Sequence, residues 1–572
     1  MIVKIKKSKK NIGVDPDEIF LDSQNLENFD QQQFEGRIEK AISKKTIIFL
    51  GVFFFLIIAT FSGRLSYLQI KKGEAYMQRS ENNTLEKHII FSDRGIIYDK
   101  NGKELVWNKK EAILAEEGEE ERRVPTRAYL SPGFSHILGY VSYPAKDKSG
   151  KFWQTDFIGK DGLEKQYDEL LRGENGAKII ETDARGNTHS ENIINNPKAG
   201  KEIYTSIDSG IQQKLFSIIK DHSEQHSFTG GAGVIMDVQN GEILTSVSFP
   251  EFSSEILSKG EDKPTINAYF KDKRKVFLDR TKSGLYTPGS IVKPFFAIGA
   301  LVEGIIDPYK KILSTGTLVI PNQYFPDKPT IFKDWKAHGW VDMRDAIAVS
   351  SDIYFYVISG GFENQKGIGI NNLEKYAKVF GIGDPTGIDM PDEKGGVIPS
   401  IEWKAKRFPG DPWRLGDTYN TSIGQYGFQV TVLEMTRAVS AIANYGTLPA
   451  PHFILNDTEK EKNARKIDID IEKEIYDVAR EGMRQVVTNG TATILNVPYV
   501  EIAGKTGTAQ VGISKNRVNS WVMGFFPYEN PKYAFTIMME SGPATGTANA
   551  SGVMRQLVDW MQNNTPEYFQ TI

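Results

Sequence analysis

The stretch Tyr286-Thr287-Pro288-Gly289-Ser290-Ile291-Val292-Lys293-Pro294 runs directly into an apolar segment, Phe295-Phe296-Ala297-Ile298-Gly299-Ala300-Leu301. Pro288-Gly289 is typical of a turn, and the apolar segment predicts a buried helix. A proline at position 294 fits only the first turn of that helix, because its missing N–H would have had no partner there. We therefore expect Ser290 at the N-terminus of this helix and Lys293, three residues later, on the same helix face.

Ser290 and Lys293 are candidate catalytic residues. A serine hydroxyl is a poor nucleophile until a neighbour takes its proton, and a close lysine whose pKa is lowered by burial can be that neighbour. The positive end of the helix dipole would favour the alkoxide that forms. Short motifs carry a known false-positive risk, so for Ser290 taken alone a catalytic and a purely structural role are about equally favoured.

The same serine-to-lysine spacing in Ser217-Ile218-Ile219-Lys220 has a different interpretation. That segment lies inside an amphipathic helix with no turn before it. We interpret it as a solvated helix face, so the spacing by itself does not identify a site.

Composition excludes several classes of site. The chain has 572 residues, enough for more than one domain, with a net charge of −3 and no cysteine. The missing cysteines exclude disulfides, thiolate zinc sites and a cysteine nucleophile. No basic stripe stands out beyond the N-terminal tail, so we expect no nucleic acid partner. His222 and His226 could pair on a metal, but a polar helix end is favoured by roughly nine to one; we expect no metal and no cofactor.

A membrane-spanning helix is predicted from Thr46 to Gly63, where no residue is charged. The segment reaches the roughly 18 residues that define a candidate span. Its lack of a polar stripe disfavours a buried soluble helix, and its length and distance from Met1 disfavour a cleaved signal peptide. Basic residues flank the predicted span equally on both sides. Only the five lysines of the N-terminal tail slightly favour an orientation with the N-terminus inside.

Two regions follow the predicted span. Residues 64 to about 205 begin with a strand, an Asn101-Gly102 turn and a second strand, and a helix is expected from Gly159 to Leu171. From Asp208 the pattern indicates a larger α/β domain, in which strands at both ends predict one sheet with helices packed against it. Its expected elements are a helix at 210–222, strands at 233–238 and 243–248, a largely helical middle at about 288–450, strands at 500–511, 519–526 and 533–541, and a helix near 550–562.

Three stretches far from Ser290 carry further polar groups. Ala348-Val349-Ser350-Ser351-Asp352 offers a second hydroxyl, Ser350, with the acceptor Asp352 two residues on. Glu501-Ile502-Ala503-Gly504-Lys505-Thr506-Gly507-Thr508-Ala509 is a glycine-broken strand, and glycine in a strand permits close approach of a ligand. Lys505 supplies positive charge there, while Thr506 and Thr508 supply hydroxyls. Ser422-Ile423-Gly424-Gln425-Tyr426-Gly427 is a glycine-spaced loop leading into an apolar helix at 431–443. Each alone could be a cap, a bulge or a turn.

Serine-x-x-lysine, a serine-Asx pair and Lys-Thr-Gly in this order form the signature of penicillin-binding proteins and related β-lactamases. From residue 46 onward the chain resembles class B penicillin-binding proteins, and within them the elongation type, penicillin-binding protein 2. Ser350-Ser351-Asp352 followed by Tyr354-Phe355-Tyr356 is similar to the elongation type. The first extramembrane region matches too, in Arg94-Gly95 with Asp99 and in Gly162-Leu163-Glu164. Between Asn108 and Phe157 the chain is shorter than the family pattern, so we expect a reduced head where a partner would dock.

The resemblance implies a mechanism. Lys293 would deprotonate Ser290, which would attack the penultimate D-Ala carbonyl of a peptidoglycan stem peptide, with the N–H groups of Ser290 and Thr508 as oxyanion hole. Ser350 would relay a proton to the departing D-Ala, tuned by Lys505. The substrate-binding residues implied are Asp352, Thr506, Gly507 and Thr508, of which Asp352 would place a carboxylate near an anionic ligand. An amine from a neighbouring strand would complete the crosslink, and β-lactams would acylate the same serine.

The same resemblance implies an organisation and a location. The fold class expected is α/β (α+β) multidomain: one transmembrane helix, a mostly-β pedestal, and a β-lactamase-like domain with an antiparallel sheet flanked by helices. We expect the enzyme in the cell (inner) membrane, with a cytoplasmic N-terminus and an extracytoplasmic catalytic domain. A rod-shape-type membrane glycan polymerase would be its partner in elongation and cell-shape maintenance. The expected segments are a cytoplasmic tail (1–45), the anchor (46–68), the pedestal (69–206), the penicillin-binding domain (207–564) and a short tail (565–572).

Two other functions share these motifs. A D,D-carboxypeptidase or β-lactamase would use the same serine for hydrolysis, although an anchor and long pedestal argue against a secreted lactamase. A non-catalytic β-lactam sensor would need a signalling element on the inner side, and the tail before Thr46 is small and featureless. The products formed from a stem peptide with and without an amino acceptor separate transfer from hydrolysis.

Overall fold

The computed structural model describes residues 43–77, 85–112, 123–148, 152–182, 188–321, 325, 327–455, 466–512, 516–545 and 547–570. The chain divides into two compact units, residues 1–86 with 181–188 and residues 87–180 with 189–572. The expected tail at 1–45 lies almost wholly outside the described residues.

Helix α1 (Lys44–Ser66) forms the apolar segment predicted to span a membrane. Ser43 caps it by accepting a hydrogen bond from Thr46 N, and a π-helical turn, η4 (Tyr67–Lys71), continues it. The 28 residues from Lys44 to Lys71 are long and apolar enough to cross a bilayer. At 1.5 Å per residue they extend about 42 Å, against a hydrocarbon core of about 30 Å. The helix fits a single-pass membrane anchor.

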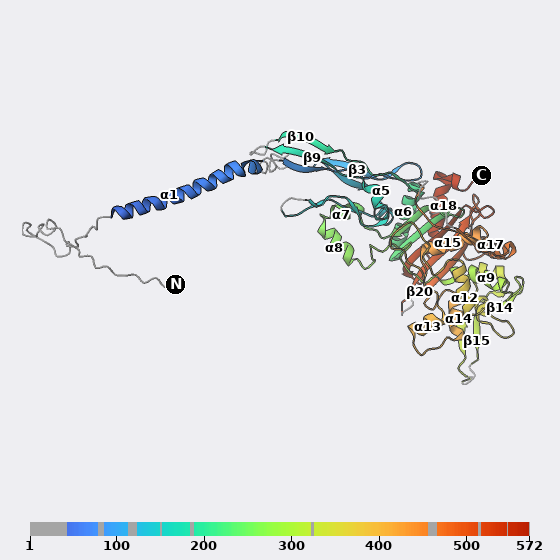
Figure 1. Cartoon of the computed structure of the whole chain (residues 1–572). Helices are drawn as coiled ribbons and strands as arrows, with labels where there is room; N and C mark the ends of the chain where they lie inside the picture. Colours follow the sequence, from blue (N-terminus) through green and yellow to red (C-terminus); the bar gives the residue numbers. More distant parts are fainter. Residues whose placement is uncertain are drawn as a thin grey trace, which may run out of the picture. The chain divides into compact units, whose positions relative to one another are not determined.

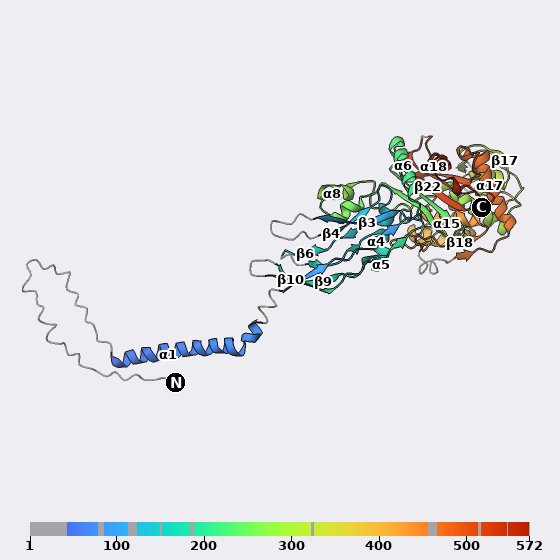
Figure 2. The same cartoon turned by 90° about the horizontal axis from the view of Figure 1, so that it is seen from above.

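The pedestal is built from short sheets, as expected. Its four-stranded sheet has the order β11-β2-β3-β4, and Gly102 turns the predicted hairpin between β2 and β3 with a positive φ of 82°. Asp99 stabilises this turn by accepting from the backbone N–H groups of Asn101 and Lys103. The strands are β1 (Leu85–Ile90), β2 (Ile97–Tyr98), β3 (Glu104–Ala112), β4 (Arg123–Tyr129), β5 (Val141–Ser142), β6 (Ala145–Lys146), β7 (Phe152–Gln154), β8 (Ile158–Gly159), β9 (Gly176–Thr182), β10 (Thr188–Asn195) and β11 (Ile203–Tyr204) (Figure 2).

The single helix expected from Gly159 to Leu171 is two short helices. Helix α4 (Gly162–Gln166) and helix α5 (Asp168–Arg172) are separated at Tyr167, and a third short helix, α3 (Ser135–Leu138), precedes them. The buried Tyr167 ring marks the break, and its hydroxyl donates to Asp389 Oδ2 at 3.0 Å in the C-terminal domain. This long-range contact, which the local sequence does not reveal, ties the pedestal to the rest of its compact unit.

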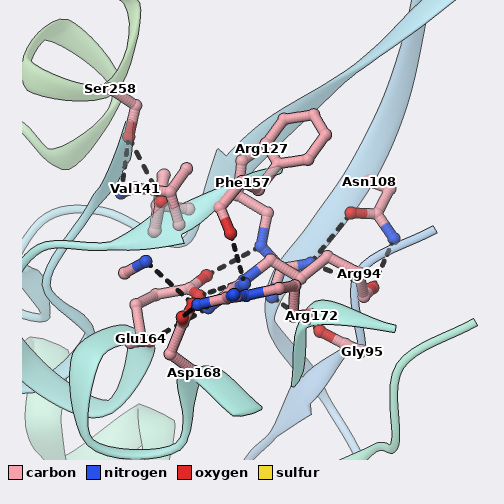
Figure 3. Close-up of polar contacts among 12 residues, drawn as sticks. Arg94, Gly95, Asn108, Arg127, Val141, Phe157, Glu164, Asp168, Arg172 and Ser258 are labelled. Carbon is pink, nitrogen blue, oxygen red and sulfur yellow. Dashed lines mark hydrogen bonds and ion pairs between the residues drawn. The ribbon is translucent and has the colours of Figure 1, made fainter. Parts of the chain in front are cut away.

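A buried ionic cluster lies in the pedestal (Figure 3). Glu164 is fully buried and pairs with Arg94 (Oε2–Nε 2.6 Å) and with Arg127 (Oε1–Nε 2.8 Å). Asp168 provides a second carboxylate for Arg94, at 2.8 Å from its terminal nitrogen. Buried charges persist only when they are paired and hydrogen-bonded, so these residues link the turn before β2, the strand β4 and the helices α4 and α5.

The C-terminal domain is organised on one antiparallel sheet with strand order β13-β12-β22-β21-β20. Figure 1 labels its edge strand β20 and the helices α6, α15, α17 and α18. The N-terminal strands β12 (Gly230–Asp237) and β13 (Ile243–Phe249) thus join the C-terminal strands β20 (Ala503–Val511), β21 (Arg517–Phe526) and β22 (Tyr533–Pro543), as predicted. Helices α6 (Ser209–His226) and α18 (Ala550–Asn564) pack together on this sheet, and α15 (Val432–Ala443) and α17 (Lys473–Thr488) also pack against it. Strand β20 is an edge strand of this sheet and packs against η5 (Gly289–Val292).

The middle of this domain is less uniformly helical than expected. Four short strands interrupt it, pairing as β14 with β17 and as β15 with β16. These strands are β14 (Ile312–Ser314), β15 (Thr317–Ile320), β16 (Thr330–Lys333) and β17 (Gly339–Val341). The remaining elements are α7 (Ser254–Lys259), α8 (Lys263–Lys271), η5 (Gly289–Val292), α9 (Lys293–Val302), α10 (Met343–Ala348), α11 (Asp352–Gly360), α12 (Ile370–Val379), α13 (Ile401–Arg407), α14 (Leu415–Ser422), β18 (Thr447–Pro449), β19 (Lys466–Asp468), η6 (Thr493–Leu495) and η7 (Pro566–Tyr568).

Candidate active site

Ser290 lies on the short 3₁₀ turn η5, which leads directly into the buried helix α9. Pro294 occupies the first turn of α9, as its position predicts. Gly289 has a positive φ of 61°, and a Cβ atom there would lie 2.9 Å from Thr508 O, so this turn requires glycine. Ser290 itself is half-buried, and among the described residues its hydroxyl has no hydrogen-bond partner. The hydroxyl is therefore free to meet a ligand.

Lys293 is fully buried, and its side-chain nitrogen is held by the segment around Ser350. It donates to Asp352 Oδ1 at 2.6 Å and to the carbonyl oxygen of Ser350 at 2.8 Å. The same nitrogen lies 5.3 Å from the centre of the Phe355 ring. Asp352 therefore pairs with a buried lysine.

Ser350 occupies the connection between α10 and α11. Its hydroxyl accepts a hydrogen bond from Lys505 Nζ at 2.8 Å and a longer one from Lys293 Nζ at 3.4 Å. Its backbone is in the left-handed region, with a φ of 59°, which is uncommon for a residue other than glycine. The structure thus brings one hydroxyl into contact with two lysines that lie 57 and 155 residues away in the sequence.

Lys505 reaches Ser350 from the edge strand β20 and is fully buried. Burial, reinforced by the nearby charge of Lys293, holds the pKa of Lys505 well below its ordinary value, although Asp352 acts in the opposite direction. Burial thus shifts the protonation balance of this lysine toward the neutral form. A neutral amine beside a hydroxyl can accept or return a proton.

The other residues of the Lys-Thr-Gly stretch line the approach to Ser290. A Cβ atom at Gly507 would lie 2.8 Å from Pro288 O, so glycine lets the strand pack against η5. Thr506 Oγ1 lies 2.6 Å from Thr491 Oγ1. Thr508 is exposed, and its backbone nitrogen is 3.4 Å from the position that a Cβ of Gly289 would take. The backbone N–H of Thr508 thus lies beside the turn that carries Ser290.

The glycine-spaced loop at 422–427 supports the same turn. Gly289 N donates to Gly424 O at 3.1 Å, and a Cβ atom at Gly424 would lie 2.2 Å from Gly289 O. From the sheet, Trp521 Nε1 donates to Thr287 O at 3.0 Å. The turn that carries Ser290 is therefore held from two sides, and of these contacts only the glycine loop was indicated by the sequence.

Metal ligands do not gather in the described part of the chain, where no group of three or more His, Asp or Glu side chains could hold an ion. The His222 and His226 rings lie 4.6 Å apart at the end of α6. Asp334, Thr491 and Trp521 are site-supporting residues that sequence reasoning missed, because no motif or periodicity marks them.

Comparisons with known proteins agree with this geometry. The model of the "Penicillin binding protein transpeptidase domain" matches residues 231–559, more than half of the chain, and that of the "Penicillin-binding Protein dimerisation domain" matches 117–205. The peptidoglycan D,D-transpeptidase MrdA of Haemophilus influenzae is 31% identical over 75% of this chain and 68% of its own length.

Two solved structures have the same fold. Penicillin-binding protein 2 of Pseudomonas aeruginosa, solved in complex with WCK 5153, has a TM-score of 0.68 at 28% identity and covers 85% of this chain and 100% of its own. The Helicobacter pylori protein, solved in complex with MreC, has a TM-score of 0.69 at 25% identity and covers 84% of this chain and 99% of its own. The α+β multidomain fold is confirmed. The chain therefore belongs to the penicillin-binding proteins, in the group of peptidoglycan D,D-transpeptidases that includes MrdA.

Proposed function

We propose that this D,D-transpeptidase uses Ser290 as its nucleophile and crosslinks peptidoglycan stem peptides during cell-wall elongation and cell-shape maintenance. The observation that carries this proposal is the convergence on Ser350 Oγ, which lies 2.8 Å from Lys505 Nζ and 3.4 Å from Lys293 Nζ. A buried hydroxyl between two lysine nitrogens supports proton transfer, and Lys293 follows Ser290 by three residues in the chain.

In the acylation step, Ser290 Oγ attacks the carbonyl carbon of the penultimate D-Ala, and its proton passes to Lys293, which takes part in its neutral amine form. Asp352, 2.6 Å from Lys293 Nζ, stabilises the ammonium group that forms. The backbone N–H groups of Ser290 and Thr508 bind the carbonyl oxygen as it becomes negative, which is usually the largest electrostatic contribution to such reactions. The closeness of Thr508 to Gly289 supports this pairing.

The tetrahedral intermediate then loses the terminal D-Ala. Its C–N bond breaks, and the departing nitrogen takes a proton from Ser350 Oγ, which the adjoining lysines replace. Lys505, Thr506 and Thr508 hold the donor's terminal carboxylate, and Gly507 permits the close approach. The ester on Ser290 is attacked by the amino group of a neighbouring stem peptide, so that an amide forms and the serine regains its proton. A β-lactam forms the same kind of ester with Ser290, but its leaving nitrogen stays attached to the acyl group and does not depart.

The location and partners follow from this chemistry. Stem peptides are crosslinked outside the membrane, so the N-terminus is cytoplasmic and the catalytic domain extracytoplasmic. A membrane glycan polymerase of the rod-shape type supplies the strands, and the anchor α1 fits a partner in the same bilayer. The Helicobacter pylori relative was solved with MreC, which supports a similar partner here. The domain boundaries at 45, 68, 206 and 564 remain part of this proposal.

Covalent labelling with a fluorescent penicillin tests the nucleophile. Ser290→Ala is expected to abolish labelling, whereas Ser217→Ala, in the helical segment with the same serine-to-lysine spacing, is expected to leave it unchanged. Labelling that persists in Ser290→Ala refutes the assignment. A stem-peptide donor incubated with and without an amino acceptor then separates transfer from hydrolysis: free acids alone, without an amide product, would favour a carboxypeptidase.

A further inference from the structure

Asp334 lies in the connection between β16 and β17 and accepts hydrogen bonds from four groups. Its side chain is fully buried, with 0% exposed. Its Oδ2 atom accepts hydrogen bonds from Ser314 Oγ (3.1 Å), Ser351 Oγ (2.9 Å) and Ile353 N (3.1 Å). Its Oδ1 atom accepts from Trp335 N at 2.8 Å. Four donors therefore converge on one carboxylate.

Two of these donors directly follow Ser350. Ser351 is the N-cap of α11 and Ile353 belongs to its first turn, so Asp334 fastens the start of that helix. Ser350, just before it, has a left-handed φ of 59°. Such a backbone conformation is strained for a residue other than glycine and persists only where the surrounding structure holds it in place. The hydrogen bonds from Ser351 and Ile353 to Asp334 help to hold Ser350 in this backbone conformation.

We propose that Asp334 is a positioning residue for the transpeptidase reaction. Through Ser351 and Ile353 it holds Ser350 and Asp352 at the positions where they meet Lys505 and Lys293. This inference rests on the proposed role of Ser350 as proton relay, and Asp334 itself touches neither substrate nor reacting atoms.

A hydrogen-bonded support is favoured over a metal centre at this position. His338 is the nearest imidazole, with its Nε2 atom 3.6 Å from Asp334 Oδ1, and its side chain is 4% exposed. The remaining groups around the carboxylate are the hydroxyls of Ser314 and Ser351 and the backbone N–H groups of Trp335 and Ile353. Within the described ranges, the pair is not part of a cluster of three metal-ligating side chains.

The substitution Asp334→Asn tests the inference with almost no change in volume. An amide has a single oxygen, so its NH₂ group must face either Trp335 N or the three donors now on Oδ2. We expect the rate constant of acylation at saturating penicillin to fall by about 10- to 100-fold, as for a displacement of about 1 Å near the reacting groups. The dissociation constant of the non-covalent penicillin complex should stay unchanged.

Asp208→Asn is the matched control. Asp208 is also buried, caps α6 by accepting from Gly210 N and Ile211 N, and accepts from Tyr568 Oη. It should lower the melting temperature and leave acylation unchanged. A similar slowing in both variants would refute a positioning role, since destabilisation alone would then explain it. If Asp334→Asn fails to fold, Ser314→Ala replaces it and should slow acylation without weakening penicillin binding.

Two further measurements complete the test. Ser351→Ala should also slow acylation, and its effect should be less than additive with that of Asp334→Asn, because both act through one hydrogen bond; full additivity would refute the inference. Acylation should be insensitive to EDTA. Inhibition by EDTA would indicate that Asp334 binds a metal ion and would refute the hydrogen-bonded support. Normal acylation in Asp334→Asn together with no labelling in Ser290→Ala would overturn this inference and leave the proposed nucleophile intact.

Discussion

Replacing Glu164 by glutamine removes the shared carboxylate of the pedestal's ionic cluster while keeping the side chain's size (Figure 3). Glu164 is 0% exposed, and the Arg94 and Arg127 side chains it pairs with are each 1% exposed. Water cannot solvate these guanidinium groups in its place. The variant therefore leaves two buried cations with less compensation than they have in the native protein.

The size of the effect follows from what each arginine retains. Arg94 keeps Asp168 at 2.8 Å. Arg127 keeps neutral acceptors: the carbonyl oxygens of Gly95 at 2.6 Å and of Arg94 at 3.3 Å, and Asn108 Oδ1 at 2.9 Å. Breaking a buried pair by removing one partner costs about 3–5 kcal/mol. We expect a loss in that range, dominated by Arg127, which is a large part of the roughly 5–15 kcal/mol that stabilises a typical domain.

Urea unfolding of the full chain in detergent, with hydrogen exchange resolved over β4, α4 and α5, measures this loss. Glu169→Gln is the control: it makes the same substitution in the neighbouring helix at an exposed position, where a change within about 0.5 kcal/mol is expected. A loss below about 1 kcal/mol for Glu164→Gln would refute the reasoning, because the cluster would then be compensated by groups other than Glu164.

Three further predictions concern charged groups of the C-terminal domain. Asp352→Ala should slow penicillin acylation by about 100-fold or more, because Lys293 loses its partner at 2.6 Å. A factor of about 100 is the lower end of general acid–base contributions. Acylation by the variant at the native rate would contradict this prediction. Burial lowers the pKa of Lys505, so below pH 10.5 the unfolded chain binds more protons and stability rises with pH toward that value. Lys505→Met should flatten that rise by up to about 1.4 kcal/mol per pH unit, and parallel denaturation curves for the two proteins would contradict it. Burial, and to a smaller extent the charge of His226, lowers the pKa of His222 from 6.5 to about 4. The stability of the folded protein should therefore fall as the pH drops from 6.5 toward 4. Melting temperatures measured over this pH range should fall less in His222→Gln, and an unchanged profile would exclude His222 as the source.

The sequence alone determined the features that depend on neighbours within a few residues. The uncharged segment from Thr46 to Gly63 predicts α1 because a helix in lipid needs only apolar side chains and its own backbone hydrogen bonds. Pro294 predicts the start of α9, and the Asn101-Gly102 turn predicts the β2–β3 hairpin, because these residues restrict or permit particular backbone angles. The glycines of the Lys-Thr-Gly stretch and of Gly424 mark close approaches, but they do not identify the partner.

Only the tertiary structure decided which of these elements meet and which residues support them. The break at Tyr167, the four strands within the expected helical middle and the pairing of Asp352 with Lys293 all depend on contacts between distant segments. Asp334 and Glu164 are buried carboxylates whose donors come from elsewhere in the chain, and no period or turn signal accompanies such a contact. The physical reason is that a side chain's burial and hydrogen-bond partners are set when the sheet and its covering helices pack, so local sequence specifies the reactive groups while long-range packing specifies their geometry.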